Sequence, residues 1–204
     1  YDEVREFAQQ RLNELKGLSV SESYVIRTDA NHMADGRKMM SRVELTAMLE
    51  SGGDVTKARL RNLSRSTDLK DRQYATELLL HSGSDENISF LIELLADPEP
   101  LVRRTAIQTA VKRFNNEVIY ALIENFNHPS FSAPSMDALV VIGEKAVPVL
   151  ESAFYRSGQS TNTLIRIVQV MGRIGSLRAK DLLWNKIDYP DKVVVSQVLL
   201  ALGN

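Results

Sequence analysis

The chain of 204 residues contains no cysteine, and this absence removes several kinds of chemistry. Without a thiol the protein forms no disulfide bond, no zinc site built on thiolates and no cysteine nucleophile. An excess of charge of either sign is also missing, because 25 Lys and Arg stand against 26 Asp and Glu, a net charge of −1. A surface built as a whole for nucleic acid carries a large excess of cations, so nucleic acid is not favoured as a partner.

Long apolar runs are missing as well. The stretch VVVSQVLLAL at 193–202 is too short to span a bilayer and contains Ser196 and Gln197. No signal peptide opens the chain, which begins at Tyr1 and ends at Asn204, directly after that apolar stretch. We therefore interpret the sequence as a fragment of a larger cytoplasmic protein, in which a membrane part could precede Tyr1.

What the sequence does contain is an internal repeat with a period of roughly 31 residues, which is typical of helical repeat proteins. The dipeptide Asp97-Pro98 recurs as His128-Pro129, and Tyr189-Pro190 follows after about two further periods. Apolar segments repeat at the same offset, for example ISFLIELL at 88–95 and IYALIENF at 119–126. Together with turn-like segments between them, these features predict unit boundaries near residues 67, 98, 129, 160 and 190.

Each unit is predicted to hold two amphipathic helices of about 10–15 residues, with apolar residues at i, i+3, i+4 and i+7. The break at 97–98 follows from Pro98, which ends one helix and is tolerated in the first turn of the next, while Asp97 can cap the new helix. One helix pair cannot bury its apolar face alone, so consecutive pairs must stack. We predict an all-α fold, an α-solenoid of stacked antiparallel helix pairs, over residues 66–204.

The first third of the chain, residues 1–65, is less regular. Helices are predicted at 1–18, 37–51 and 55–64, and an irregular connector at 19–36. We expect this segment to be an atypical helical cap that covers the apolar edge of the first unit, or else a linker from an upstream domain.

The segment 97–103 has the pattern D-P-x-x-x-V-R, which resembles HEAT repeats of the short, armadillo-type kind. The resemblance covers residues 66–204, about two thirds of the chain. The pattern weakens in the next unit, where His128 stands in place of the aspartate and Pro134 and Ser135 in place of the arginine pair. Signatures of ankyrin and tetratricopeptide repeats are absent.

Arginines recur at matching positions of the units, and two roles fit them. A row of cations could bind phosphate or carboxylate groups, or each arginine could pair with a carboxylate or a helix-end carbonyl of a neighbouring unit. The second role is usual in proteins with HEAT repeats, so the resemblance favours a structural ladder. Its expected members are Arg72, Asp97, Arg103, Arg104 and Arg166.

Candidate binding residues follow from the stacked architecture. Stacked helix pairs present an extended concave surface, which we expect the second helix of each unit to line and which suits a partner protein or peptide. From helical phase alone, the predicted lining residues are Glu93, Tyr120, Glu124, Tyr155 and Lys186. Trp184 is a further candidate as a binding anchor, but its spacing from Leu183 and Ile187 also fits core packing, which is the favoured interpretation.

The sequence contains no recognisable catalytic or metal-binding constellation. His32, His81 and His128 are scattered, and no H-E-x-x-H motif occurs. The segment 31–41 lacks the glycines and the terminal Gly-Lys-Ser/Thr of a phosphate loop. The basic segment 57–65 could contact nucleic acid or lipid head groups, but few aromatic residues interleave with it, which favours a solvated helix face. We therefore predict no cofactor, no metal and no enzymatic activity.

Three functions stay open at this point. The favoured one is a non-catalytic interaction scaffold, a bacterial module of a larger protein. The resemblance also implies a soluble regulatory domain of a membrane transporter similar to ATP/ADP exchangers, or an enzyme of the bilin lyase type. A DNA-binding protein related to HEAT-like glycosylases is opposed by the nearly neutral charge.

Overall fold

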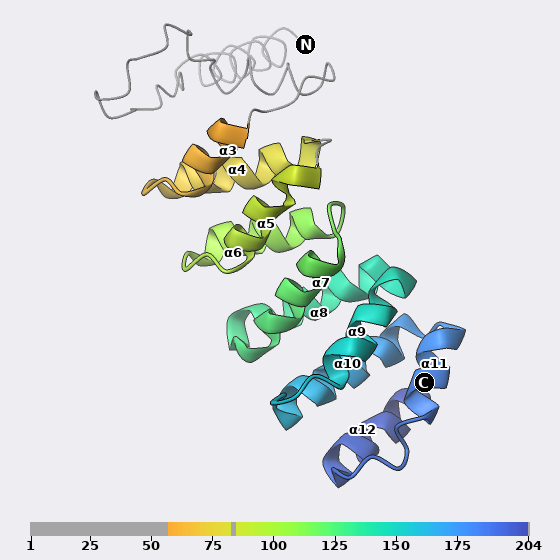
Figure 1. Cartoon of the computed structure of the whole chain (residues 1–204). Coiled ribbons are helices and arrows are strands. Elements are labelled where there is room, and N and C mark those ends of the chain that lie inside the picture. Colours follow the sequence, from red (N-terminus) through yellow and green to blue (C-terminus); the bar gives the residue numbers. More distant parts are fainter. Residues whose placement is uncertain (1–56, 83–84, 204) are drawn as a thin grey trace, which may run out of the picture. The chain divides into compact units, whose positions relative to one another are not determined.

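The computed structural model describes residues 57–82 and 85–203, and every regular element in these two ranges is a helix (Figure 1). The chain divides into two units, residues 1–53 and 54–204, and the described residues belong to the second. The helices predicted at 1–18 and 37–51, with the connector between them, lie outside the described residues. The expected division into a cap of residues 1–65 and repeats of residues 66–204 stays a prediction.

Ten α-helices and three short 3-10 helices follow one another in the described part of the chain. The α-helices are α3 (Lys57–Ser64), α4 (Leu69–His81), α5 (Ile88–Leu95), α6 (Pro100–Ala110), α7 (Asn116–Glu124), α8 (Pro129–Ile142), α9 (Val147–Phe154), α10 (Thr161–Ile174), α11 (Leu177–Trp184) and α12 (Lys192–Leu202). The 3-10 helices are η1 (Asp85–Asn87), η2 (Asn125–Asn127) and η3 (Gly143–Ala146).

The helices form two layers, which follow from their packing partners. Each of α4, α6, α8, α10 and α12 packs against the next member of this set, and we call the set the first-helix layer. In the same way α3, α5, α7, α9 and α11 pack in sequence and form the second-helix layer. Helix pairs succeed one another from α3 to α12 in Figure 1, so the predicted all-α solenoid is confirmed.

Both small and large apolar side chains are buried in the core. Ala75, Ala106 and Ala110 of the first-helix layer are fully buried, and their size allows neighbouring helices to approach closely. Leu91 and Leu122 of the second-helix layer are equally buried and contribute large apolar side chains to the core. Burying one leucine side chain stabilises the fold by about 2 kcal/mol, so this contiguous apolar seam is the main source of stability.

The turn before α6 differs in one detail from the sequence-based expectation. Asp97 does not cap α6 directly, because the helix begins at Pro100 and its N-cap is Glu99. The carboxylate of Asp97 instead accepts the backbone N–H of Glu99 at 2.9 Å, which orders the turn just before the helix. A second proline two residues after Pro98 moves the helix start, because proline fits best at the first helical position.

Candidate functional site

Arg72 and Asp97 join two successive units. The Nε of Arg72 donates to Oδ2 of Asp97 at 2.8 Å, and Nη2 donates to Oδ1 at 3.3 Å. The remaining Nη1 donates to the carbonyl oxygen of Ser66 at 2.9 Å. Both charged side chains are largely buried, so this two-bond pair holds α4 against the turn before α6.

Arg103 occupies the same position one unit later, but its surroundings are different. Its side chain is only 8% exposed, and its Nε donates to Oδ1 of Asn125 at 2.9 Å, as does its Nη2. The guanidinium lies 4.5 Å from the centre of the Phe131 ring. Among the described residues no carboxylate lies within ion-pairing distance of Arg103. Burial lowers the pKa of the guanidinium, and the more distant charge of Asp97 acts in the opposite direction.

The difference between the two arginines has a visible cause in the sequence. Asp97 follows Arg72 by 25 residues, and the residue 25 positions after Arg103 is His128. Asn125, on η2, supplies a neutral amide oxygen instead, and its own Nδ2 donates to the carbonyl of Leu95. Arg103 is therefore a buried cation without the carboxylate that Asp97 provides to Arg72 in the preceding unit.

The two other expected ladder residues, Arg166 and Arg104, are arranged differently from each other. Arg166 donates from Nη1 to the carbonyl oxygen of Phe126, a helix-end contact across two units. Arg104 is exposed and lines a groove between α6 and α8 with Gln108 and Val141, so it does not join the ladder. Ser135, which stands where the arginine would be, has a buried hydroxyl oxygen without a hydrogen-bond partner.

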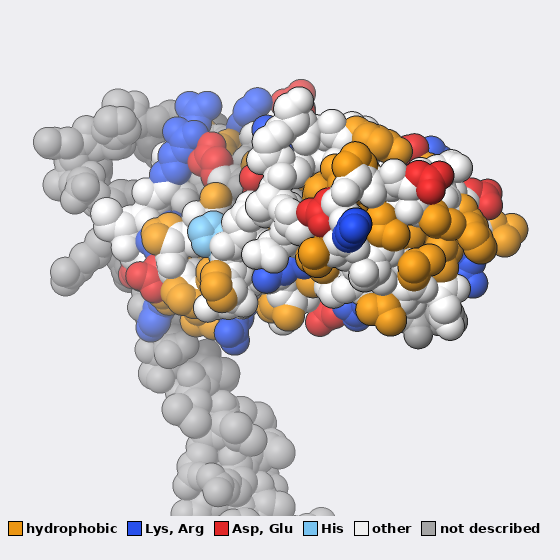
Figure 2. Space-filling model, turned by 90° about the horizontal axis from the view of Figure 1, so that it is seen from below, with side chains coloured by type: hydrophobic (Ala, Val, Ile, Leu, Met, Phe, Trp, Pro, Cys, Tyr) orange, Lys and Arg blue, Asp and Glu red, His pale blue; other side chains and the backbone are white. Residues whose placement is uncertain are grey.

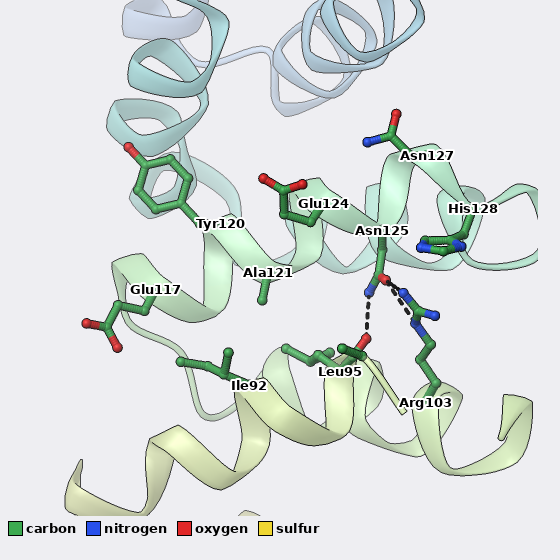
Figure 3. A pocket seen from close by; sticks show the side chains of 11 residues that line it. Ile92, Leu95, Arg103, Glu117, Tyr120, Ala121, Glu124, Asn125, Asn127 and His128 are labelled. Atoms are coloured by element: carbon green, nitrogen blue, oxygen red, sulfur yellow. Dashed lines mark hydrogen bonds between the residues drawn. The ribbon is translucent and has the colours of Figure 1, made fainter. Parts of the chain in front are cut away.

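A cavity of about 500 Å³ opens between α5 and α7, next to Arg103 (Figure 3). Its walls carry the apolar side chains of Ile92 and Leu95 on one side and Tyr120 of α7 on the other. Figure 3 shows Arg103, Asn125 and His128 at one end of it, with the bonds from Arg103 to Asn125 and from Asn125 to Leu95 dashed. The remaining polar lining residues are Glu117, Glu124 and Asn127.

The polar residues predicted to line the second helices bridge neighbouring helices of that layer. Tyr120 of α7 donates to the hydroxyl of Ser152 at 2.8 Å, and Glu124 pairs with Arg156 at 2.9 Å. These side chains border a second, more open cavity of about 530 Å³ that Tyr155 also lines. On the preceding helix Glu93 accepts two bonds from Arg65, and these bonds lower the pKa of the Glu93 carboxyl.

Lys186 and Trp184 differ most from their sequence-based expectations. Lys186 is only 1% exposed, so it does not line the surface. Its ammonium donates to the Tyr155 hydroxyl at 2.9 Å and lies 4.4 Å and 4.2 Å from the ring centres of Phe154 and Tyr155. Trp184 is 61% exposed, which contradicts the core-packing interpretation of its spacing. Helical phase alone could not reveal which side of α11 its neighbours cover.

Apolar side chains also gather at the α12 end of the stack. Figure 2 views the molecule from that end and shows hydrophobic side chains over a wide part of it. The exposed large apolar residues there include Val193, Leu199 and Leu200 of α12. A contiguous apolar surface of this kind accepts another apolar surface more readily than a charged one does.

Two further kinds of site are absent from the described part of the chain. No group of three or more His, Asp or Glu side chains in residues 57–82 and 85–203 is arranged to hold a metal ion. In the same ranges no helix combines the length and the apolar character that crossing a bilayer requires.

Comparison with known proteins identifies the repeat and a general likeness of fold. HEAT repeats match residues 56–143, and no curated protein matches the chain. The structure of the complex of CpcE and CpcF of phycocyanin lyase from Nostoc sp. PCC7120 is 17% identical, with a TM-score of 0.41, and the match covers 86% of this chain and 69% of that chain. An engineered protein is 18% identical, with a TM-score of 0.36 and coverages of 79% and 83%. With TM-scores below 0.5, neither likeness supports a conclusion about this chain.

Proposed function

We propose that the chain is a non-catalytic scaffold that binds a partner protein or peptide, because residues 56–143 match HEAT repeats. The second-helix layer provides the binding surface, as one module of a larger cytoplasmic protein. Stacked repeats suit this role, because each added unit extends the same surface without a new core.

Exposed aromatic side chains on adjacent second helices carry this proposal. Tyr155 directly follows α9 and Trp184 ends α11, two helices that pack against each other, and each side chain is 61% exposed. Tyrosine and tryptophan are the residues most enriched among those that dominate binding energy at protein interfaces. Exposure of both side chains to water is unfavourable, and a partner that covers them removes this cost.

Site-specific photocrosslinking tests the proposal. A photoreactive phenylalanine analogue at Trp184 is expected to capture a defined partner in the cells that produce the protein, because this side chain would lie in the interface. The matched control carries the same analogue at Val141, which is 70% exposed but lies on α8 of the first-helix layer. Equal capture from both positions would contradict the proposal, as would an unlabelled Trp184→Ala competitor that suppresses capture as well as the unlabelled wild type does.

The other two functions implied by the resemblance stay predictions. A regulatory domain of a transporter similar to ATP/ADP exchangers would use the same surface for a partner segment of its own protein. An enzyme of the bilin lyase type would need polar groups placed around a tetrapyrrole, and adding a tetrapyrrole to the protein while recording absorbance would test for them.

A further inference from the structure

We propose that the cavity between α5 and α7 is a binding site for a carboxylate group, which the guanidinium of Arg103 recognises. The cavity shares Tyr120 and Glu124 with the proposed partner surface, but a free carboxylate would be sufficient to occupy it, so the proposal can be tested without a partner. It follows from the break in the arginine–aspartate ladder at His128.

The first argument concerns the charge of Arg103. A buried charge is costly unless an opposite charge or a full set of hydrogen bonds compensates it. Arg72 has this compensation in Asp97, whereas Arg103 has one neutral amide oxygen of Asn125 and the face of Phe131. Its two bonds leave from Nε and Nη2, so within the described residues Nη1 has no protein acceptor. The edge of the Arg103 guanidinium that contains Nη1 therefore stays available to an external anion.

The second argument concerns the turn that precedes α8. At the equivalent turn Asp97 both binds Arg72 and accepts the backbone N–H of Glu99. His128 does neither, and no side chain caps the 14-residue helix α8 that it precedes. Two groups that favour a negative oxygen, the guanidinium of Arg103 and the uncapped start of α8, thus occur together where histidine stands in place of aspartate. His128 is exposed and lines the cavity, so small solutes can reach the start of α8.

The lining identifies the class of anion. A guanidinium edge fits the two oxygens of a carboxylate in one plane, as Arg72 and Asp97 demonstrate within this protein. Glu117 also lines the cavity, and its negative charge opposes a phosphate dianion more strongly than a monoanion. The cavity of about 500 Å³ has room for a carboxylate on a small apolar or aromatic body, which Ile92 and Leu95 would contact.

A titration of the full chain tests the proposal with sodium acetate, N-acetylglutamate amide and inorganic phosphate as probes, each matched to sodium chloride at equal ionic strength. Backbone amide NMR shifts of Asn125 and Asn127 report local binding, and the unfolding temperature reports its effect on stability. A saturable response to acetate identifies a site for free carboxylates. A response to the glutamate derivative alone identifies a site for an acidic side chain of a partner. No response to either, or an equal response to phosphate, would overturn the proposal.

His128→Asp provides the decisive variant, because it offers Arg103 the internal carboxylate that Arg72 already has. The variant is expected to unfold at a higher temperature than the wild type and to bind the carboxylate probe at least about tenfold more weakly. His128→Ala is the matched control, since it removes the imidazole without adding a charge or a capping oxygen and should keep the response. If His128→Asp binds the probe as tightly as the wild type does, Arg103 is not the receptor.

Discussion

At the scale of the residue, buried polar groups decide how successive units are bonded to one another. Arg72 with Asp97, Arg103 with Asn125, and Lys186 with Tyr155 each connect different helices, and each includes a cation with little exposure. An apolar seam alone would allow helices to slide, whereas these bonds are satisfied in one register. Their removal is therefore expected to cost more than that of the exposed pairs.

The pair of Arg72 and Asp97 gives the clearest prediction of this kind. Asp97→Ala leaves a largely buried guanidinium without its partner, so we expect the free energy of unfolding to fall by about 3 kcal/mol. Asp137→Ala is the control, because it removes an exposed pair with Arg173 and should cost less than about 1 kcal/mol. Urea denaturation followed by circular dichroism measures both values, and similar losses for the two variants would refute the prediction.

The lowered pKa of the Asp191 carboxyl predicts that the stability of the fold depends on pH. Its carboxylate accepts the backbone N–H of Val193 and the hydroxyl of Thr161, and these bonds lower its pKa from the ordinary value of 3.8. A lowered pKa in the folded state adds stability above 3.8 that disappears as the pH falls through the folded value. Urea denaturation should therefore find the wild type more stable than Asp191→Asn near neutral pH, with the difference decreasing as the solution becomes acidic. A constant difference would contradict this assignment.

At the scale of the element, the first-helix layer depends on close approach between helices. Gly172 of α10 faces Ala201 of α12, and a Cβ at position 172 would lie 2.7 Å from the Cβ of Ala201. Two carbon atoms cannot remain at this distance, so the helices must separate if residue 172 carries a side chain. This contact explains why α10 contains a glycine at position 172, although alanine has the higher helix propensity.

This contact predicts that a substitution at Gly172 lowers the stability of the fold, whereas helix propensity alone would predict an increase. We expect Gly172→Ala to lower the free energy of unfolding by about 1–2 kcal/mol, because the clash outweighs the gain in helix propensity of about 1 kcal/mol. Adding Ala201→Gly to it should restore part of the loss, since it removes the opposing methyl group. Thermal unfolding of the three proteins decides the matter, and a single variant more stable than the wild type would disprove the steric argument.

At the scale of the whole molecule, the described stack is a series of neighbours without a common centre. Each helix packs on the helices of its own and the adjacent units, so a disturbance should weaken with distance along the stack. The arginine ladder is an example, because the pair of Arg72 and Asp97 is complete although Arg103 in the next unit lacks a carboxylate.

This arrangement predicts additivity for distant substitutions. Asp97 precedes α6 and Gly172 lies in α10, and α8 separates these two helices within the first-helix layer. We expect the losses caused by Asp97→Ala and Gly172→Ala to add within about 0.5 kcal/mol in the double variant. Hydrogen exchange should show each loss mainly in its own and adjacent helices. A large coupling between the two substitutions would instead indicate a single cooperative core.

Much of the architecture could be predicted from the sequence, whereas the candidate sites could be predicted only in part. The period and the turn-forming residues between apolar helices indicate a solenoid, because helix ends and amphipathic faces depend on local chemistry. The replacement of aspartate by His128 was likewise visible. Its consequence for Arg103 was not, since the position of Asn125 and the cavity beside it depend on how two units meet.

The sequence by itself therefore determined which segments are helices, how often they recur and where the ladder is broken. Only the tertiary structure decided that Lys186 is enclosed by the rings of Phe154 and Tyr155 while Trp184 on the neighbouring segment faces solvent. Helical periodicity places a side chain at an angle around its own axis, but burial depends on what an adjacent helix puts in front of it. That neighbour lies about 30 residues away in the chain, beyond the reach of local pattern.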